Sequence, residues 1–184
     1  ETFENAVFVL PSQRSGVFVK QSLKDNIKSG FLPEIINIEQ FVSRISEIQK
    51  ADSVQLLFHF YTIYKEQEPE PDSFEIFSSW AFTVIQDFNE IDQHLTSSKD
   101  IFEYLRDIKR LENWSVKGAF EETELIKDHF KFIEKLNQYY DAFYAFLLEN
   151  KMGYQGVLYR EATKKVDDYI KKHSKKKVFF IGFN

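Results

Sequence analysis

The sequence predicts a predominantly helical α/β fold in which a small parallel sheet carries a large helical insertion. Two short apolar runs, Ala6–Leu10 and Val178–Ile181, predict the sheet, because continuous apolar runs are typical of parallel strands buried on both faces. The insertion is predicted by the residues between them, where apolar side chains recur mostly at steps of three and four. We therefore expect the two runs to be neighbouring parallel strands, joined by an unusually long right-handed crossover.

The first segments of the chain indicate a strand, a loop and a helix. Pro11 ends the strand, since proline has no N–H group to donate to a central ladder. The polar residues Ser12–Gly16 are typical of a turn, and apolar residues at helical spacing follow them. The run Glu34–Ile38 indicates a possible second strand, and a helix begins at its end, at Asn37 or Glu39.

Helical periodicity and capping residues predict five further helices before the last strand. Their expected starts or spans are Asp52 or Ser53, Asp72 or Ser73, Ser97 or Ser98, Glu121–Glu149 and Val157–Lys172. The second of these gives the strongest helical signal in the chain, and a loop at Asn113–Gly118 precedes the fourth. We therefore divide the chain into an α/β part at residues 1–50, a helical subdomain at residues 51–152 and a returning helix and strand at residues 153–184.

Composition restricts the class of protein. The 184 residues are 43% hydrophobic, which is ample for a packed core, and the lack of cysteine excludes disulfides and thiolate metal sites. No apolar run reaches the ~18 residues of a membrane span and no signal-peptide pattern is present, so we expect no membrane association and a cytoplasmic location. The formal net charge of −5 opposes general binding of nucleic acid, so any DNA contact should be local.

A nucleotide-binding motif and a nuclease motif each match the sequence only in part. A Walker phosphate-binding loop needs Gly-Lys-Ser/Thr, which occurs nowhere, so Ser12–Gly16 is first of all interpreted as a plain strand-to-helix turn. A PD-(D/E)XK nuclease needs an Asp, then an acid and a Lys on one strand. Asp72 and Asp107-Ile108-Lys109 supply these letters, but Asp72 has the position of a helix N-cap, and the second set lies in a helical pattern where residues i and i+2 do not share a face.

Other charged groups leave further alternatives open. In the segment DFNEID, Asp87 and Glu90 lie on one helical face beside Asp92, so a carboxylate metal site is conceivable, although a solvated helix face is the favoured interpretation. The four histidines form no pair at ligand spacing. The basic run Lys171–Lys177 could meet phosphates, although a solvated helix C-terminus is favoured there too.

Five segments, taken in order, resemble a known family. They are LPSQRSG after the first strand, NIEQFV after PEI, WAFTVIQDFNEID, GYQGVLYREA and VFFIGFN. Together they resemble the N-terminal region of AddB-like proteins, which are PD-(D/E)XK nuclease family subunits of bacterial helicase-nuclease complexes. The resemblance spans essentially the whole chain. It implies a partial RecA-like sheet, similar to the first domain of superfamily 1 helicases, with a large inserted helical subdomain.

The resemblance implies DNA-binding residues in two segments. Ser12, Gln13 and Arg14 would match a motif that touches single-stranded DNA, and Glu39 and Gln40 would lie in the next DNA-facing motif. The first segment also has a physical reason to bind a phosphate. A loop at the carboxyl end of a parallel strand, beside a helix N-terminus, offers amides and a positive dipole, and Arg14 adds a charge.

The same resemblance implies that ATP is not hydrolysed at this sheet. The segment Phe180–Asn184 would match the Walker B strand, but Gly182 and Asn184 stand where carboxylates would hold Mg²⁺. The Walker A loop would precede Glu1, and the nuclease domain with its Mg²⁺ would lie far C-terminal. Because the chain begins without Met and ends just after a strand of the buried type, we expect it to be part of a longer polypeptide.

We therefore expect a helicase-like, catalytically degenerate region that binds or guides DNA during the repair of double-strand breaks. Its expected partners are DNA and an AddA-like ATPase subunit, and we expect no cofactor and no catalytic residue within these 184 residues. Two alternatives stay open. One is a helical protein–protein interaction module with no nucleic-acid role, which the acidic net charge favours. The other is a metal-dependent enzyme that uses the carboxylates of DFNEID.

Overall fold

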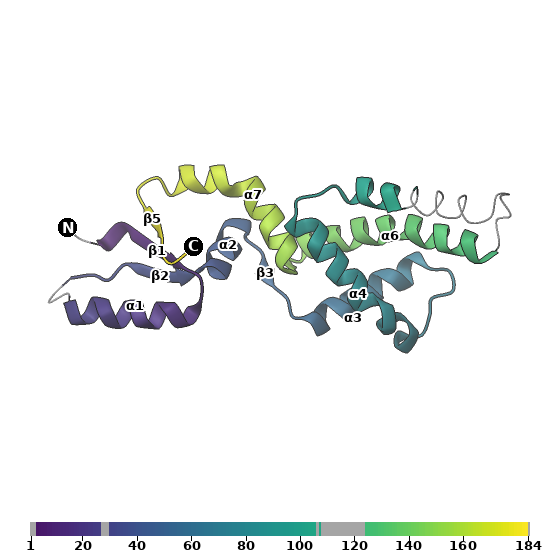
Figure 1. Ribbon diagram of the computed structural model, residues 1–184, viewed down its shortest axis with the longest axis horizontal. Helices are drawn as coiled ribbons and strands as arrows, with labels where there is room; N and C mark the ends of the chain where they lie inside the picture. The colour runs from purple at the N-terminus through teal and green to yellow at the C-terminus, as the bar shows by residue number, and fades with distance from the viewer. Residues whose placement is uncertain (1–2, 27–29, 106, 108–123, 184) are drawn as a thin grey trace. The chain divides into compact units, whose positions relative to one another are not determined.

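The computed structural model describes residues 3–26, 30–105, 107 and 124–183, and Figure 1 shows its elements. The chain forms two compact units. The first, here called the sheet unit, comprises Glu1–Ile48 and Glu161–Asn184, and the second, the helical unit, comprises Gln49–Arg160. The chain thus passes between the units after residues 48 and 160, where the sequence placed boundaries after residues 50 and 152.

The sheet unit is built around three parallel strands in the order β2-β1-β5. Its elements are the 3-10 turn η1 (Phe3–Asn5), β1 (Ala6–Leu10), α1 (Gln13–Asn26), β2 (Glu34–Asn37), α2 (Ile38–Ser46), the second part of α7 (Gln155–Lys172) and β5 (Lys177–Phe180). In the register, Val9 of β1 pairs with Ile36 of β2 and with Phe180 of β5. The predicted parallel pairing of the first and last strands is confirmed, and so is the possible second strand.

Side chains alternate across the central strand and meet helices on both faces. Val7 and Val9 point to one face, where they pack with Phe41 of α2 and Ala162 of α7. On the opposite face α1 approaches β1 and β2 closely enough that a Cβ on Gly16 would lie 3.5 Å from Ile35. The strand β1 is therefore covered on both sides, as its continuous apolar sequence predicts.

The last strand differs from the expectation of burial. Phe179 and Phe180 are 46% and 56% exposed, whereas Val7 and Val9 of β1 are at most 1% exposed. The reason is position, because β5 lies at the edge of the sheet and its only strand partner among the described residues is β1. Both of its phenylalanines still have aromatic contacts, Phe179 with Phe8 at 5.6 Å and Phe180 with Phe41 at 5.5 Å and Phe183 at 5.9 Å.

The helical unit contains β3 (Gln49–Lys50), α3 (Ser53–Gln67), α4 (Phe74–Gln93), a helical segment at residues 98–105, α6 (Glu124–Glu149), β4 (Met152–Gly153) and the first part of α7. The two short strands pair in parallel, and α3 packs against α4 and α6. The core is aromatic: Phe60, Phe77, Phe88 and Phe143 are at most 1% exposed. None of the described helices combines the length and apolar character that crossing a bilayer requires.

Capping explains where the helices of this unit begin. Asp52 caps α3 through the N–H groups of Val54 and Gln55, as predicted. The N-cap of α4 is Ser73, so the cap role expected for Asp72 is wrong. The predicted loop at Asn113–Gly118, the start of the long helix at Glu121, and Ile108-Lys109 lie outside the described residues.

Candidate functional site

Three segments of the chain gather at one edge of the sheet, here called the carboxyl edge. Because β1, β2 and β5 are parallel, their carboxyl ends meet there, and Leu10 pairs directly with Asn37. On the other side, Ile181 donates its N–H to the carbonyl of Val9 at 3.0 Å, so the chain after β5 reaches the same edge. The structure thus brings together the two predicted segments, Ser12–Arg14 and Glu39–Gln40.

The first of these segments is the start of α1. The Ser12 hydroxyl accepts the N–H of Ser15 at 3.3 Å, while the Ser15 hydroxyl donates to the carbonyl of Ser12 at 2.7 Å. Ser12 therefore holds the first turn of α1 together, in the manner of an N-cap. The side chains of Gln13 and Arg14 extend from that turn and are exposed.

The second segment is the start of α2, where a reciprocal capping box forms. Gln40 donates its N–H to Asn37 Oδ1 at 2.7 Å, and the N–H of Asn37 donates back to Gln40 Oε1 at 3.1 Å. The side-chain oxygen of Gln40 is thus occupied in closing the helix. Glu39 is exposed in the same turn, where a negative charge suits the positive end of the helix dipole.

The basic run lies at the opposite edge of the sheet. Lys177 opens β5 and pairs with Ala6 at the start of β1, so the run enters the sheet at its amino edge. Lys176 lies 3.3 Å from Glu34, which also pairs with Arg44 at 2.6 Å. The Arg44 hydrogen bond, with help from Lys176, outweighs partial burial and lowers the pKa of the Glu34 carboxyl. Because the basic run lies at the amino edge, it adds no charge to the carboxyl edge. Arg14 is the one cation among the predicted DNA-binding residues there.

A second polar centre lies in the core of the helical unit around Asp92, which is fully buried. Its carboxylate accepts hydrogen bonds from Tyr140 at 2.5 Å and Tyr154 at 2.7 Å, and it forms an ion pair with Arg160 at 2.6 Å. Burial raises the pKa of Asp92, and these three partners offset part of that rise. Because the partners come from α6, from α7 and from the residue before α7, the arrangement joins α4 to α6 and to the start of α7.

This finding corrects the interpretation of DFNEID as a solvated face at one residue, Asp92. Asp87 and Glu90 are exposed, but Asp92 points inward and is held by core residues, so the three carboxylates do not converge. Within the described ranges, no group of three acidic or histidine side chains is arranged to hold a metal ion. Spacing gave a signal for Asp92 that sequence reasoning missed, because it lies four residues after the buried Phe88 on the apolar stripe.

The two segments DFNEID and GYQGVLYREA, distant in sequence, are in direct contact. Asn89 Oδ1 accepts the N–H of Gly156 at 2.8 Å, which caps the start of α7. Arg160 donates to the carbonyl of Ile91 at 3.0 Å, in the last turn of α4, and to the carbonyl of Thr96 at 2.5 Å, just after that helix. Both segments therefore have a structural role within the helical unit.

Of the nuclease letters, Asp107 is described in a helical conformation, while Ile108 and Lys109 lie outside the described residues. Asp72 is exposed, and its Oδ2 accepts a hydrogen bond from Tyr64 at 3.0 Å.

Comparison of the chain with protein-family models, with curated proteins and with solved structures finds no significant match.

Proposed function

We propose that this chain is the N-terminal, helicase-like and catalytically degenerate region of an AddB-like helicase-nuclease subunit, and that its carboxyl edge contacts single-stranded DNA during break repair. The observation that carries the proposal is the convergence of Ser12–Arg14 and Glu39–Gln40 at the carboxyl ends of adjacent parallel strands. Open α/β sheets bind their ligands at such an edge. On this proposal the sheet unit is part of a RecA-like domain and the helical unit is its insertion.

The chemistry available at the carboxyl edge is modest and fits guiding a strand better than cleaving it. The first turn of α1 offers backbone N–H groups, and Arg14 adds a planar guanidinium that can bind a phosphate through two hydrogen bonds. Gln13 adds a neutral donor, while Glu39 repels phosphate. At the end of β5 the sequence has Gly182 and Asn184, which offer no carboxylate for Mg²⁺. The energy for movement would come from an AddA-like ATPase partner in the cytoplasm.

The salt dependence of single-strand binding tests the proposal. We expect Arg14→Ala to weaken binding of a fluorescent oligo-dT and to lower the slope of log K against log salt by roughly 0.7, the value for one phosphate contact on a single strand. Lys20→Ala is the matched control, because Lys20 is an exposed cation farther along α1. Equal affinity and equal slope for wild type and Arg14→Ala would show that the loop is only a structural turn.

One observation favours the protein-interaction module as a second candidate. Val54 and Phe58 are each 55% exposed one turn apart on α3, and Phe58 stacks on Phe74 at 5.1 Å, which makes an apolar surface on the helical unit. Phe58→Glu should abolish association with a purified AddA-like subunit if this surface is an interface, and on this candidate neither wild type nor variant should bind oligo-dT. Association that survives Phe58→Glu would remove the support for this candidate.

A further inference from the structure

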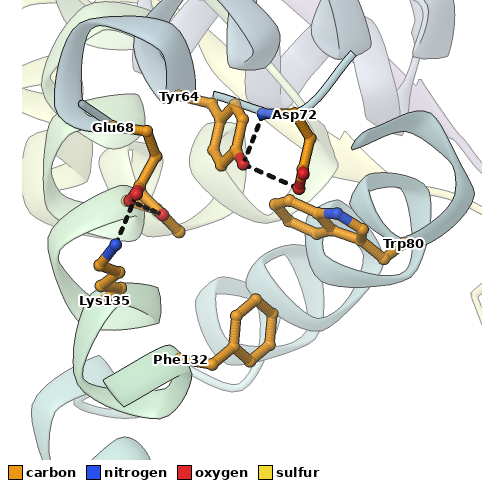
Figure 2. A pocket seen from close by; sticks show the side chains of 7 residues that line it. Tyr64, Glu68, Asp72, Trp80, Phe132 and Lys135 are labelled. Carbon is orange, nitrogen blue, oxygen red and sulfur yellow. Dashed lines mark hydrogen bonds and ion pairs between the residues drawn. The ribbon is translucent and has the colours of Figure 1, made fainter. Parts of the chain in front are cut away.

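A pocket of about 260 Å³ opens within the helical unit between the end of α3, the segment before α4, and α6 (Figure 2). Its walls are largely aromatic, with Tyr64, Trp80 and Phe132 among them. Trp80 meets Phe132 edge to face at 5.7 Å and Tyr64 at 5.6 Å. Tyr64 is 6% exposed and packs on the core residue Phe77, so the core of the unit holds part of the wall in place.

One side of the pocket is an ion pair that the fold already satisfies. Lys135 lies 2.5 Å from Glu68, whose side chain is 11% exposed, and the hydroxyl of Tyr139 also donates to Glu68. Burial alone would raise the pKa of Glu68, but the hydrogen bonds from Lys135 and Tyr139 outweigh it and the pKa is lowered. Glu68 is therefore ionised at neutral pH, and Lys135 neutralises it.

The other side of the pocket carries the carboxylate of Asp72, which can accept further hydrogen bonds. Asp72 Oδ2 accepts a hydrogen bond from Tyr64, and the N–H of Asp72 donates to the same hydroxyl at 3.3 Å. Tyr61 donates to the Asp72 carbonyl at 3.1 Å, so three contacts fix this residue. Oδ1 of Asp72 has no hydrogen-bond partner in the described part of the chain. Two carboxylates and one ammonium leave the pocket with a net charge of −1.

We propose that this pocket binds a guanidinium group, which stacks against Trp80 and Phe132 and donates hydrogen bonds to Asp72. A guanidinium is planar, is weakly hydrated, and combines stacking on aromatic faces with a forked hydrogen bond to a carboxylate. The net negative charge disfavours phosphate and carboxylate ligands. Figure 2 shows Glu68 and Lys135 on one side of the pocket and Asp72 and Trp80 on the other, which keeps the bound cation apart from Lys135. The inference is independent of DNA binding at the carboxyl edge.

Small probes test the chemistry directly on the intact protein. The indole N–H resonance of Trp80 is the reporter, assigned with Trp114→Phe because the chain has two tryptophans. We expect N-acetyl-arginine methylamide to shift this resonance saturably. The citrulline analogue, which has the same shape without the charge, should bind at least roughly tenfold more weakly, since a hydrogen bond between charged groups is lost. Equal binding of the two probes, or binding of adenosine in place of arginine, would overturn the proposal.

Two substitutions and one further probe complete the test. Asp72→Asn keeps an acceptor for Tyr64 but removes the charge, and we expect roughly tenfold weaker arginine binding with little change in the urea midpoint. Glu70→Gln removes an exposed charge two residues away and should leave binding unchanged. Unchanged binding by Asp72→Asn would refute the assignment. Free L-arginine separates the sources: binding of the blocked amide alone indicates a polypeptide arginine, and binding of free arginine indicates a small molecule.

Discussion

Tyr154 donates its hydroxyl to the buried carboxylate of Asp92 at 2.7 Å, although 62 residues separate the two in sequence. Tyr154 immediately precedes α7 and Asp92 lies in the last turn of α4, so this contact joins the end of α4 to the start of α7. Removing a donor leaves a buried carboxylate with one partner fewer, and this relationship gives the first two predictions.

Tyr154→Phe should lower the free energy of unfolding of the helical unit by about 1–3 kcal/mol, because it removes a hydrogen bond to a buried, charged acceptor. Urea unfolding followed by Trp80 fluorescence measures the effect. Tyr159→Phe is the matched control, since among the described residues its hydroxyl accepts only from the partly exposed Gln155 at 2.7 Å. A control that is as destabilised as Tyr154→Phe would mean that the Asp92 contact has no special weight.

Asp92→Asn and Glu68→Gln should each change the free energy of unfolding, and the two changes should depend on pH in opposite directions. The pKa of Asp92 is raised in the folded state, so its contribution to stability is greatest at low pH and declines as pH rises from the usual 3.8 through the raised value. The pKa of Glu68 is lowered, so its contribution is present above the usual 4.5 and is lost as pH falls through the lowered value.

The measurement is the difference in unfolding free energy between wild type and each variant, from urea titrations at about pH 3 to 6. For Asp92→Asn the advantage of wild type should shrink as pH rises, and for Glu68→Gln it should grow. Slopes of the same sign for both variants would contradict the opposite environments of the two carboxylates.

Gly156→Ala should destabilise the helical unit by at least about 2 kcal/mol, because an added methyl group overfills a packed contact. A Cβ at this position would lie 2.4 Å from the carbonyl oxygen of Asn89 and 2.7 Å from Asp92 Cβ, and backbone cannot swing aside as a flexible side chain can. Gly16→Ala is the counterpart in α1, where the nearest atoms are 3.5 Å away. We expect it to stabilise the sheet unit by about 0.5–1 kcal/mol through helix propensity. Amide hydrogen exchange reports on the two units separately.

Phe60→Ala should lower the free energy of unfolding of the helical unit by about 3–5 kcal/mol, because it empties the centre of the aromatic core. Phe60 is fully buried and contacts Phe77 at 5.3 Å and Phe143 at 5.0 Å. Phe58→Ala, two residues earlier on the same helix, removes a side chain that is 55% exposed and should cost about 1 kcal/mol or less. Thermal unfolding compares the two, and similar losses would place the core elsewhere.

The local elements of this protein follow from its sequence. The continuous apolar run of β1, the Asp52 cap of α3 and the long stripe of α4 all depend on residues close together in the chain, because helices and strands reveal their period locally. The pairing of β1 with β5 is long-range, and it is predicted because both runs have the same continuous apolar character. The two predicted loop segments lie together for the same kind of reason, since parallel strands place their carboxyl ends at one edge.

Tertiary packing decided the rest. Whether an apolar strand is central or at an edge depends on its neighbours in the sheet, so Phe180 is exposed while Val9 is buried. The inward position of Asp92 depends on Tyr140, Tyr154 and Arg160, which no spacing connects to it. The pocket likewise combines α3 and α4 with α6, because periodicity shows which face of a helix is apolar but not which other helix will cover it.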